Sequence, residues 1–164
     1  MSAREILAAD GALRRARSRG GPMIEALALH MRHVRHLDED RGVAGMVLDR
    51  FRAAQRAGNI PRRPAPRDDD SVVIALDGET FAGFATYHPV NDKRLWLDVL
   101  WVEPNHRRRG VAVRLLHEVE LAAQRRHLRG LLLGHDQNNA AMTALMQHAG
   151  WPVDHIVRSK EVRP

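Results

Sequence analysis

One run of eight residues, 95–102, constrains the fold of this chain more than any other segment. Seven of the eight are apolar and the other is Asp98, a composition typical of a strand that is buried on both faces. Upstream, residues 71–76 and 79–87 are rich in β-forming side chains and flank Asp77-Gly78, a pair typical of a hairpin turn. The run is therefore predicted to continue a meander of strands.

Helical patterns precede and follow this meander. Residues 22–37 are predicted to form a helix, because four apolar residues recur at helical spacing after Pro22. A second helix is expected over residues 43–58, followed by an extended, proline-rich linker. Downstream we expect a helix over residues 110–130, a strand at 131–133, a helix at 139–149 and a last strand at 153–162. These elements make one α/β domain.

Composition excludes several kinds of chemistry. The 164 residues include no cysteine, which rules out disulfides, thiolate zinc sites, iron–sulfur clusters and a cysteine nucleophile. No run of about 18 apolar residues is present to cross a membrane. The first 20 residues also lack the apolar core of a secretion signal. We therefore expect a cytoplasmic protein with no membrane partner.

Polar clusters that could suggest a metal site do not have the required spacing. His30, His33 and His36 recur every three residues, but such steps drift around a helix, and no carboxylate is spaced to complete a site. An exposed polar stripe is the better interpretation. The three aspartates at residues 68–70 lack the later ligands of a calcium loop and are predicted to form a solvated turn. No metal site is predicted.

The positive charge is concentrated in the first two-fifths of the chain. The net charge is +6, and residues 1–67 hold 14 basic and 7 acidic side chains. Residues 1–21 are weakly patterned and are predicted to be a basic N-terminal arm. Such asymmetry can mark a surface for nucleic acid. This partner is not favoured, because residues 1–67 offer only Phe51 among the aromatic residues that stack on bases.

An arginine-rich turn connects the apolar run to the following helix. Residues 102–112 read Val-Glu-Pro-Asn-His-Arg-Arg-Arg-Gly-Val-Ala. A helix that begins at Gly110 would present unpaired backbone amides and the positive end of its dipole, without a side chain to block close approach. Arginines beside it can pair with phosphate oxygens. The pattern predicts an anion site, although a capped surface turn would have the same features.

This turn resembles the signature of the GNAT superfamily of acyl-CoA-dependent N-acyltransferases. The signature is Arg/Gln-x-x-Gly-x-Gly/Ala after a strand, and residues 107–112 match it. A second block agrees, since Asn139, Leu145 and Gly150-Trp151 have the spacing of the superfamily's Asn…Leu-Tyr…Gly-Phe segment. The resemblance covers about residues 71–151. It implies a mixed, mostly antiparallel central sheet flanked by helices, and an acetyltransferase domain over residues 22–164.

The resemblance also implies a site for acetyl-CoA as co-substrate. The backbone of the strand before the signature, at Leu100 and Val102, would pair with the pantetheine arm. Asn139 would reach that arm or the loop beside it. The pyrophosphate would be held by the turn residues Arg107, Arg108, Arg109, Gly110, Val111 and Ala112. Arg108 stands where many members have glycine, so it either crowds the turn or adds a phosphate contact.

Asp98 is the predicted catalytic residue. Attack by an amine needs a group that takes a proton, because an alkylamine is mostly protonated at neutral pH. Burial of a carboxylate among apolar residues would raise its pKa towards that of a useful base. Asp98 also lies six residues before Pro104, where relatives often carry an acidic residue. The alternatives for Asp98 are a satisfied core carboxylate or an aspartate at a strand end. Glu103 is the competing carboxylate, and we expect it to be solvated at the strand exit.

The proton donor typical of the superfamily is missing. The usual donor is a tyrosine four residues before the glycine of the second block, and Met146 occupies that position. Tyr87 is the only tyrosine, and packing is the preferred interpretation of it. A thiolate is a fair leaving group, so transfer could proceed without a side-chain acid. Alternatively, the missing tyrosine marks a module that binds acyl-CoA without turnover.

The sequence therefore predicts an N-acetyltransferase that moves an acetyl group from acetyl-CoA to a primary amine by direct attack. The acceptor would be an amine-bearing small molecule or peptide. Two alternatives stay open, namely an acetyltransferase directed to an amine on nucleic acid and a non-catalytic acyl-CoA-binding module. The 13 residues after Trp151 are few for the superfamily's final two strands, so a homodimer could complete the sheet edge.

Overall fold

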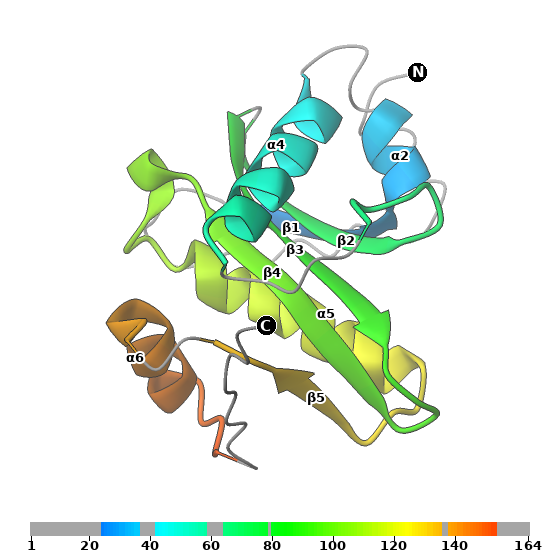
Figure 1. The fold of residues 1–164 in the computed structure, drawn as a ribbon, viewed down its shortest axis with the longest axis vertical. Coiled ribbons are helices and arrows are strands. Elements are labelled where there is room, and N and C mark those ends of the chain that lie inside the picture. The colour runs from blue at the N-terminus through cyan, green and yellow to red at the C-terminus, as the bar shows by residue number, and fades with distance from the viewer. Residues whose placement is uncertain (1–23, 37–41, 59–63, 79, 136–137, 154–164) are drawn as a thin grey trace, which may run out of the picture.

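The computed structural model describes residues 24–36, 42–58, 64–78, 80–135 and 138–153 (Figure 1). The five strands form one sheet in the order β1-β2-β3-β4-β5. They are β1 (Ile24–His30), β2 (Ser71–Asp77), β3 (Thr80–Pro89), β4 (Arg94–Val102) and β5 (Gly130–Leu133). The helices are α2 (Met31–His36), α4 (Val43–Arg56), α5 (Val111–Arg125) and α6 (Ala140–His148), with a short 3-10 turn, η1 (Pro104–His106). Strands β1 to β4 are antiparallel neighbours and β5 runs parallel to β4, which confirms the mixed, mostly antiparallel sheet.

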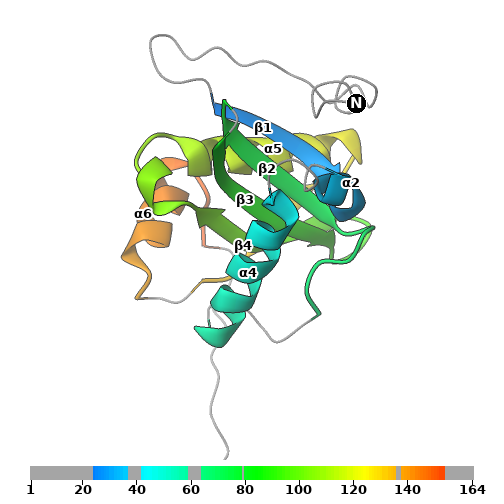
Figure 2. The same ribbon diagram turned by 90° about the horizontal axis from the view of Figure 1, so that it is seen from above.

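The sheet separates two layers of helices. Figure 2 shows α2 and α4 on one face and α5 on the other. The face under α4 carries large side chains such as Leu27, Ile74 and Phe84. The first three strands are lined mainly by alanines on the face under α5, namely Ala26, Ala75, Ala82 and Ala85. Small side chains let a helix lie close to a sheet, so α5 is held near the strands that precede it.

The helix predicted at residues 22–37 is wrong for residues 24–30. These residues form strand β1, which pairs with the whole of β2 from Ile24↔Asp77 to His30↔Ser71. The segment Glu-Ala-Leu-Ala-Leu consists of good helix formers, and Leu27 belongs to a set of apolar residues at helical spacing, Met23, Leu27, Met31 and Val34. Burial on both faces of the sheet overrides that local preference, because a strand places alternate residues in the two cores. Only α2, which follows directly, retains the predicted helix.

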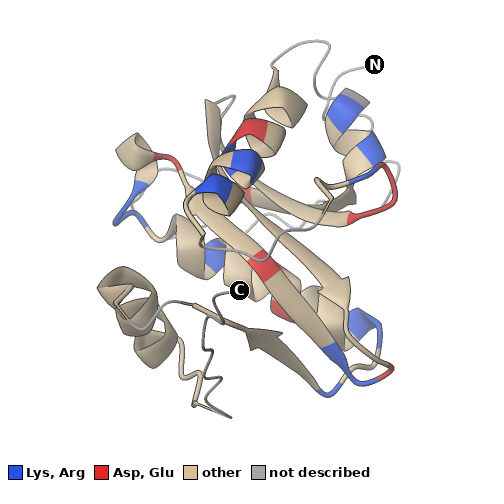
Figure 3. Cartoon of the chain, viewed as in Figure 1, with Lys and Arg blue, Asp and Glu red and all other residues tan. Residues whose placement is uncertain are grey.

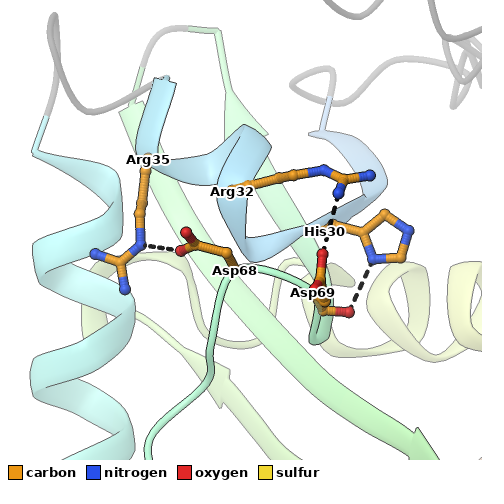
Figure 4. Close-up of polar contacts among 5 residues, drawn as sticks. All are labelled: His30, Arg32, Arg35, Asp68 and Asp69. Atoms are coloured by element: carbon orange, nitrogen blue, oxygen red, sulfur yellow. Dashed lines mark hydrogen bonds and ion pairs between the residues drawn. The ribbon is translucent and has the colours of Figure 1, made fainter.

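The segment before β2 fixes how α2 begins. The backbone N–H groups of Met31 and Arg32 donate to the carbonyl oxygens of Asp70 and Asp68, at 2.9 and 2.8 Å. Figure 4 shows Arg35 and Arg32 of α2 paired with the Asp68 and Asp69 carboxylates, at 2.7 and 3.0 Å. The predicted turn at residues 68–70 is thus exposed, and it also supplies acceptors to the helix start. Exposed ion pairs of this kind each contribute less than about 1 kcal/mol.

Strand β4 changes its environment near its middle. Its first half, Arg94 to Leu97, pairs with β3 on one side and with β5 on the other. At Asp98 the register with β3 shifts, because Thr86 pairs with Val99 whereas Tyr87 pairs with Leu97. Asp98 is therefore the extra residue of a β-bulge. Beyond it, within the described part of the chain, β4 has no partner on the β5 side.

The bulge also changes which side chains of β4 point to each face of the sheet. Leu97 packs in the core under α5 and Val99 packs in the core under α4, although alternate residues of a regular strand share a face. After the bulge, Leu100 and Val102 return to the α5 side while Trp101 packs on the α4 side. The sequence pattern of β4 alone, which is apolar at nearly every position, does not reveal this switch.

Some predicted elements fall on residues that the structure does not describe. The basic arm at residues 1–21 lies outside the described residues. The last strand, predicted at residues 153–162, also lies outside them except for Val153. Among the described residues, no helix has the length and apolar character needed to cross a membrane.

Candidate functional site

A cavity of about 710 Å³ opens where β4 and β5 part. Its walls are the end of β4 from Leu100 to Val102, the turn before α5, the first residues of α5, and α6 together with Asn139. In Figure 1, α6 lies beside the end of β4 and the beginning of α5. The cavity therefore joins the two sequence blocks that the resemblance brought together. Of the predicted cofactor residues, all but Arg109 line it.

The beginning of α5 is shaped to receive an anion. Gly110 is the N-cap residue in a left-handed conformation with φ 81°, and a Cβ atom there would meet nothing within 4 Å. The first intrahelical bond to its carbonyl oxygen comes from Arg114, so the amides of Val111, Ala112 and Val113 precede the helical hydrogen-bond ladder. Unpaired amides at a helix start attract phosphate groups. The residues present thus fit the pyrophosphate of CoA.

The three arginines of the turn take three different positions. Arg107 donates from Nε to the Val102 carbonyl oxygen at 3.2 Å and lies over the Trp101 ring at 5.7 Å. Arg108 is exposed, with a left-handed backbone at φ 61°, which explains why glycine suits this position. Arg109 pairs with Asp77 at 2.9 Å and lies outside the cavity lining. Only Arg107 and Arg108 therefore bring positive side chains to the cavity.

Charged residues elsewhere on the described chain are interleaved rather than separated by sign. Figure 3 shows Lys and Arg on α2, on α4 and in the turn before α5, with acidic residues between these segments. Several of these arginines are paired, including Arg35 with Asp68 and Arg50 with Glu103.

His106 is buried in the same turn. Its side chain is 11% exposed, its Nε2 atom lies 3.6 Å from a carboxylate oxygen of Asp77, and it lines the cavity. The structure gives its Nδ1 atom no hydrogen-bond partner among the described residues. Asp77 thus pairs with Arg109 at 2.9 Å and lies close to His106, so the turn is joined to the end of β2 mainly through Arg109.

Glu103 is not the solvated carboxylate that we expected. Its side chain is 17% exposed and accepts hydrogen bonds from Arg50 of α4 and from the Trp101 indole, each at 3.0 Å. Partial burial opposes ionisation of Glu103, but the hydrogen bonds from Arg50 and Trp101 and the charge of Arg50 outweigh it and lower the pKa of the carboxyl. The hydrogen bond to Glu103 in turn raises the pKa of Arg50. Glu103 therefore stays ionised and ties α4 to the end of β4, which makes it a poor proton acceptor.

Asn139 has a structural role at the far wall of the cavity. Its side-chain oxygen accepts a hydrogen bond from the backbone amide of Met142 at 3.0 Å, so Asn139 is the N-cap residue of α6. The side-chain amide nitrogen is the group that can donate to a ligand. The second sequence block thus begins at a helix cap as well as at a cavity wall.

Asp98 is buried and bonded to a histidine. The carboxylate is 3% exposed, and its Oδ2 atom lies 3.0 Å from Nδ1 of His88 on β3. His88 is 39% exposed and faces away from Tyr87, its neighbour in the core under α5. The pair therefore lies on the α4 side of the sheet. Sequence reasoning singled out Asp98 and did not identify His88.

Neither Met146, which stands where the superfamily has its acid, nor Tyr87 is placed as a proton donor to the cavity. Met146 is 7% exposed, packs in the core under α5 and does not line the cavity. Tyr87 is 4% exposed and lies on the opposite face of the sheet from Asp98, beneath the guanidinium of Arg126 at 5.6 Å. Burial raises the pKa of Tyr87, and nearby Arg126 only partly offsets it. This environment supports the packing role for Tyr87.

The histidines at the beginning of α2 do not form a cluster with acidic groups. His30 lies at the end of β1, and its Nδ1 atom is 3.0 Å from the Asp69 carbonyl oxygen. Its ring contacts that of His33 edge-on. Within the described ranges, no group of three or more His, Asp or Glu side chains is placed to hold a metal ion.

The sequence matches one protein-family model over most of its length. That model describes the acetyltransferase (GNAT) family and covers residues 34–151. No sequence among the curated proteins matches the chain.

Several solved structures of similar fold are acetyltransferases with low sequence identity to this chain. The aminoglycoside acetyltransferase AAC(6')-Iy, solved with the bisubstrate analogue CoA-S-monomethyl-acetylneamine, superposes with a TM-score of 0.59 at 20% identity, covering 86% of this chain and 99% of that one. An aminoglycoside acetyltransferase from an uncultured soil metagenomic sample gives 0.61 at 13% identity, with 86% and 97% covered. A ribosomal-protein-alanine N-acetyltransferase from Brucella melitensis biovar Abortus 2308 gives 0.56 at 17% identity, with 85% and 99% covered.

Proposed function

The chain belongs to the acetyltransferase (GNAT) family, and from this we propose that it moves an acetyl group from acetyl-CoA to a primary amine by direct attack. We call the part of β4 after Asp98, which has no partner on the β5 side among the described residues, its open half. The observation that carries the proposal is the cavity of about 710 Å³ that begins at this open half and ends at the N-terminus of α5. An elongated ligand with a thioester at one end and phosphates at the other suits a cavity of this kind.

The phosphate end of acetyl-CoA would meet the beginning of α5. The backbone amides from Arg107 to Ala112 would receive the pyrophosphate, and the Arg107 and Arg108 side chains would add positive charge. The bend at Gly110 leaves open space where a side chain would otherwise stand. Arg109 would contribute through its backbone, since its side chain pairs with Asp77.

The pantetheine arm would run along the open half of β4. Backbone groups of Leu100 and Val102 on the side without a strand partner among the described residues would hydrogen-bond to it, while Asn139 would donate from the opposite wall. The thioester would then lie near Asp98, where β4 and β5 part. Bound acetyl-CoA supplies the acyl group and the thiolate leaving group. The protein positions the amine, and Asp98 accounts for the removal of its proton.

The acceptor is proposed to be a small molecule or a peptide with a free amine. Two of the similar structures are aminoglycoside acetyltransferases and a third is a ribosomal-protein-alanine N-acetyltransferase. Both acceptor classes carry primary amines, so the shared chemistry is amine acetylation. We further propose that the domain spans residues 22–164, that residues 1–21 form a basic arm, that the protein is cytoplasmic and that a homodimer completes the sheet edge.

The test is release of CoA in the presence of acetyl-CoA and a panel of acceptors. The panel comprises aminoglycosides, peptides with a free N-terminus, polyamines and aminoacyl-tRNA. Amine-dependent appearance of free thiol, together with an acetylated product of the expected mass, supports the proposal. Acetyl-CoA binding without thiol release for any acceptor would show a binding module. Activity on aminoacyl-tRNA alone, with a steep loss of affinity as salt rises, would favour the nucleic-acid alternative.

A further inference from the structure

His88 and Asp98 form a hydrogen-bonded pair in which one side chain is exposed and the other is buried. We propose that His88 is the base that contacts the acceptor amine, and that Asp98 is a positioning residue that acts through it. The inference rests on the proposed function and names a residue that neither the sequence motifs nor the family match assigns.

Exposure separates the two side chains. The Asp98 carboxylate is 3% exposed, whereas the His88 ring is 39% exposed and lies 3.0 Å from it. An amine in solvent can contact the exposed His88 ring, whereas the burial of Asp98 leaves little of its carboxylate within reach. The buried carboxylate therefore reaches the substrate through the imidazole.

The contact between the two residues fixes which ring nitrogen is basic. The bond joins Oδ2 of Asp98 to Nδ1 of His88. An ionised carboxylate can only accept a hydrogen bond, so Nδ1 carries the hydrogen and Nε2 carries the lone pair. The carboxylate also stabilises the imidazolium that forms when Nε2 takes a proton. Such a contact orients the imidazole ring, as in other carboxylate–histidine sites.

The bulge places this pair next to the point where β4 and β5 part, although neither residue lines the cavity itself. Asp98 is the extra residue between the pairs Tyr87↔Leu97 and Thr86↔Val99, and it directly follows the last pair between β4 and β5, Leu97↔Leu133. The cavity begins two residues further on, at Leu100. The bulge in β4 therefore turns the Asp98 carboxylate to the side of His88. It lies directly after the last residue of β4 that pairs with β5.

The proton balance of the reaction suits a histidine. A protonated amine loses one proton before its nitrogen attacks the thioester carbon, and a second after the new C–N bond has formed. His88 would accept each in turn at Nε2. The first passes to solvent, and the second ends on the CoA sulfur when the C–S bond breaks. The imidazolium is itself an acid, so this cycle needs no tyrosine at Met146.

The experiment compares three variants for turnover and for the KM of acetyl-CoA. His88→Ala should lower kcat about 10²–10⁴-fold with the KM of acetyl-CoA nearly unchanged. Added imidazole should restore part of the lost rate, and substituted imidazoles should restore it in the order of their basicity. Asp98→Asn should lower kcat by about 10²-fold or more without rescue, because His88 still occupies the site. His117→Ala, which removes a histidine paired with Glu120 on α5, is the matched control and should leave kcat unchanged.

The outcomes are distinct. Turnover of His88→Ala within about threefold of the wild type would overturn the proposal. Loss of turnover that no imidazole restores, with acetyl-CoA binding intact, would assign the base to Asp98 itself and would also overturn it. If His88→Ala does not fold, His88→Gln keeps a polar group of similar reach next to Asp98, and its kcat decides in the same way. A wild-type protein that releases no CoA with any acceptor would contradict the proposed function instead.

Discussion

The two halves of β4 have nearly the same composition and opposite functions. Residues 94–97 are paired on both sides, by β3 and by β5, and they close the sheet. Residues 99–102 are paired with β3 alone among the described strands, and residues 100–102 form a wall of the cavity. The bulge at Asp98 separates the halves. An apolar run can thus end a core and begin a binding site where its partner strand departs. Four substitutions test this contrast between the two halves.

The largest effect is expected where the open half leads into α5, at Gly110. Gly110→Asp places a negative charge and a side chain in the open space where the pyrophosphate is proposed to sit. At acetyl-CoA concentrations of about 100 times Kd, a ligand stabilises the wild type by about 2.7 kcal/mol. The variant should lose this stabilisation, measured as the shift of Tm on adding acetyl-CoA.

Gly58→Asp is the matched control for backbone strain. Gly58 has φ 72°, and a Cβ atom there would meet nothing within 4 Å, yet it lies beyond the end of α4 and outside the cavity. The control should lose intrinsic stability as Gly110→Asp does and keep the full shift with acetyl-CoA. An unchanged ligand shift in a folded Gly110→Asp protein would remove the phosphate site from α5.

The second test disturbs the pairing of β3 with the open half of β4. Gly83 on β3 lies opposite Val102, and a Cβ atom there would collide with the carbonyl oxygen of Trp101. Gly83→Ala should therefore destabilise the protein by about 1–3 kcal/mol, as over-packing does. Gly45→Ala on the exposed side of α4 meets nothing within 4 Å and should instead stabilise by about 0.5–1 kcal/mol. Equal effects of the two changes in urea unfolding would contradict the close approach of β3 and β4.

A smaller effect is expected at the exit of the open half, where Glu103 joins Arg50. Because the pKa of Glu103 is lowered in the folded state, its contribution to stability is present above its ordinary value of 4.5 and is lost as pH falls through the folded value. Glu103→Gln should cost about 1 kcal/mol at pH 7, since the pair is partly exposed. The difference between the two proteins should shrink below about pH 4. Urea unfolding across a pH series measures it, and a difference that grows with acid would contradict the ion pair.

The smallest effect is expected at Arg108. Arg108→Gly relieves a left-handed backbone at φ 61° but adds freedom to the unfolded chain, so we expect a gain of at most about 1 kcal/mol. If the side chain also contacts a phosphate, acetyl-CoA affinity should fall by less than about tenfold. Calorimetric titration and urea unfolding separate the two contributions. A loss of stability would show that the backbone strain at Arg108 costs less than the freedom that glycine adds to the unfolded chain together with any contact the side chain makes in the folded protein.

Much of the fold follows from local sequence, and β1 shows where such reasoning fails. The hairpin, the apolar strand and α5 were predictable because turn residues and periodicity agree there. The segment at residues 24–30 was predicted as part of a helix because apolar residues recur at helical spacing after Pro22, while its true structure depends on pairing with β2, more than 40 residues away. Pairing over such a distance is invisible to a local pattern.

The parts of the site that are formed by residues close together in the sequence were predictable. The Gly110 turn combines a special backbone conformation and a helix start within a few residues, so a short motif describes it. The partners of Asp98 and Glu103 depend on register and packing instead. His88 could have been found from the hairpin between β3 and β4, since alternation places it on the face opposite Tyr87. The bulge that directs Asp98 towards His88 cannot be recognised in a run of apolar residues.

Strand β5 has a thermodynamic consequence beyond the shape of the cavity. Among the described residues it joins the sheet only through the pairs from Arg94↔Gly130 to Leu97↔Leu133, and α6 follows it in the chain. A unit attached along such a short edge opens at a lower free energy than the meander of β1 to β4. Amide hydrogens of β5 and α6 should therefore exchange with solvent before those of β2 and β3. A ligand that contacts both α5 and α6 would stabilise the closed position of β5 and α6. It would therefore slow hydrogen exchange there without changing exchange in the rest of the sheet.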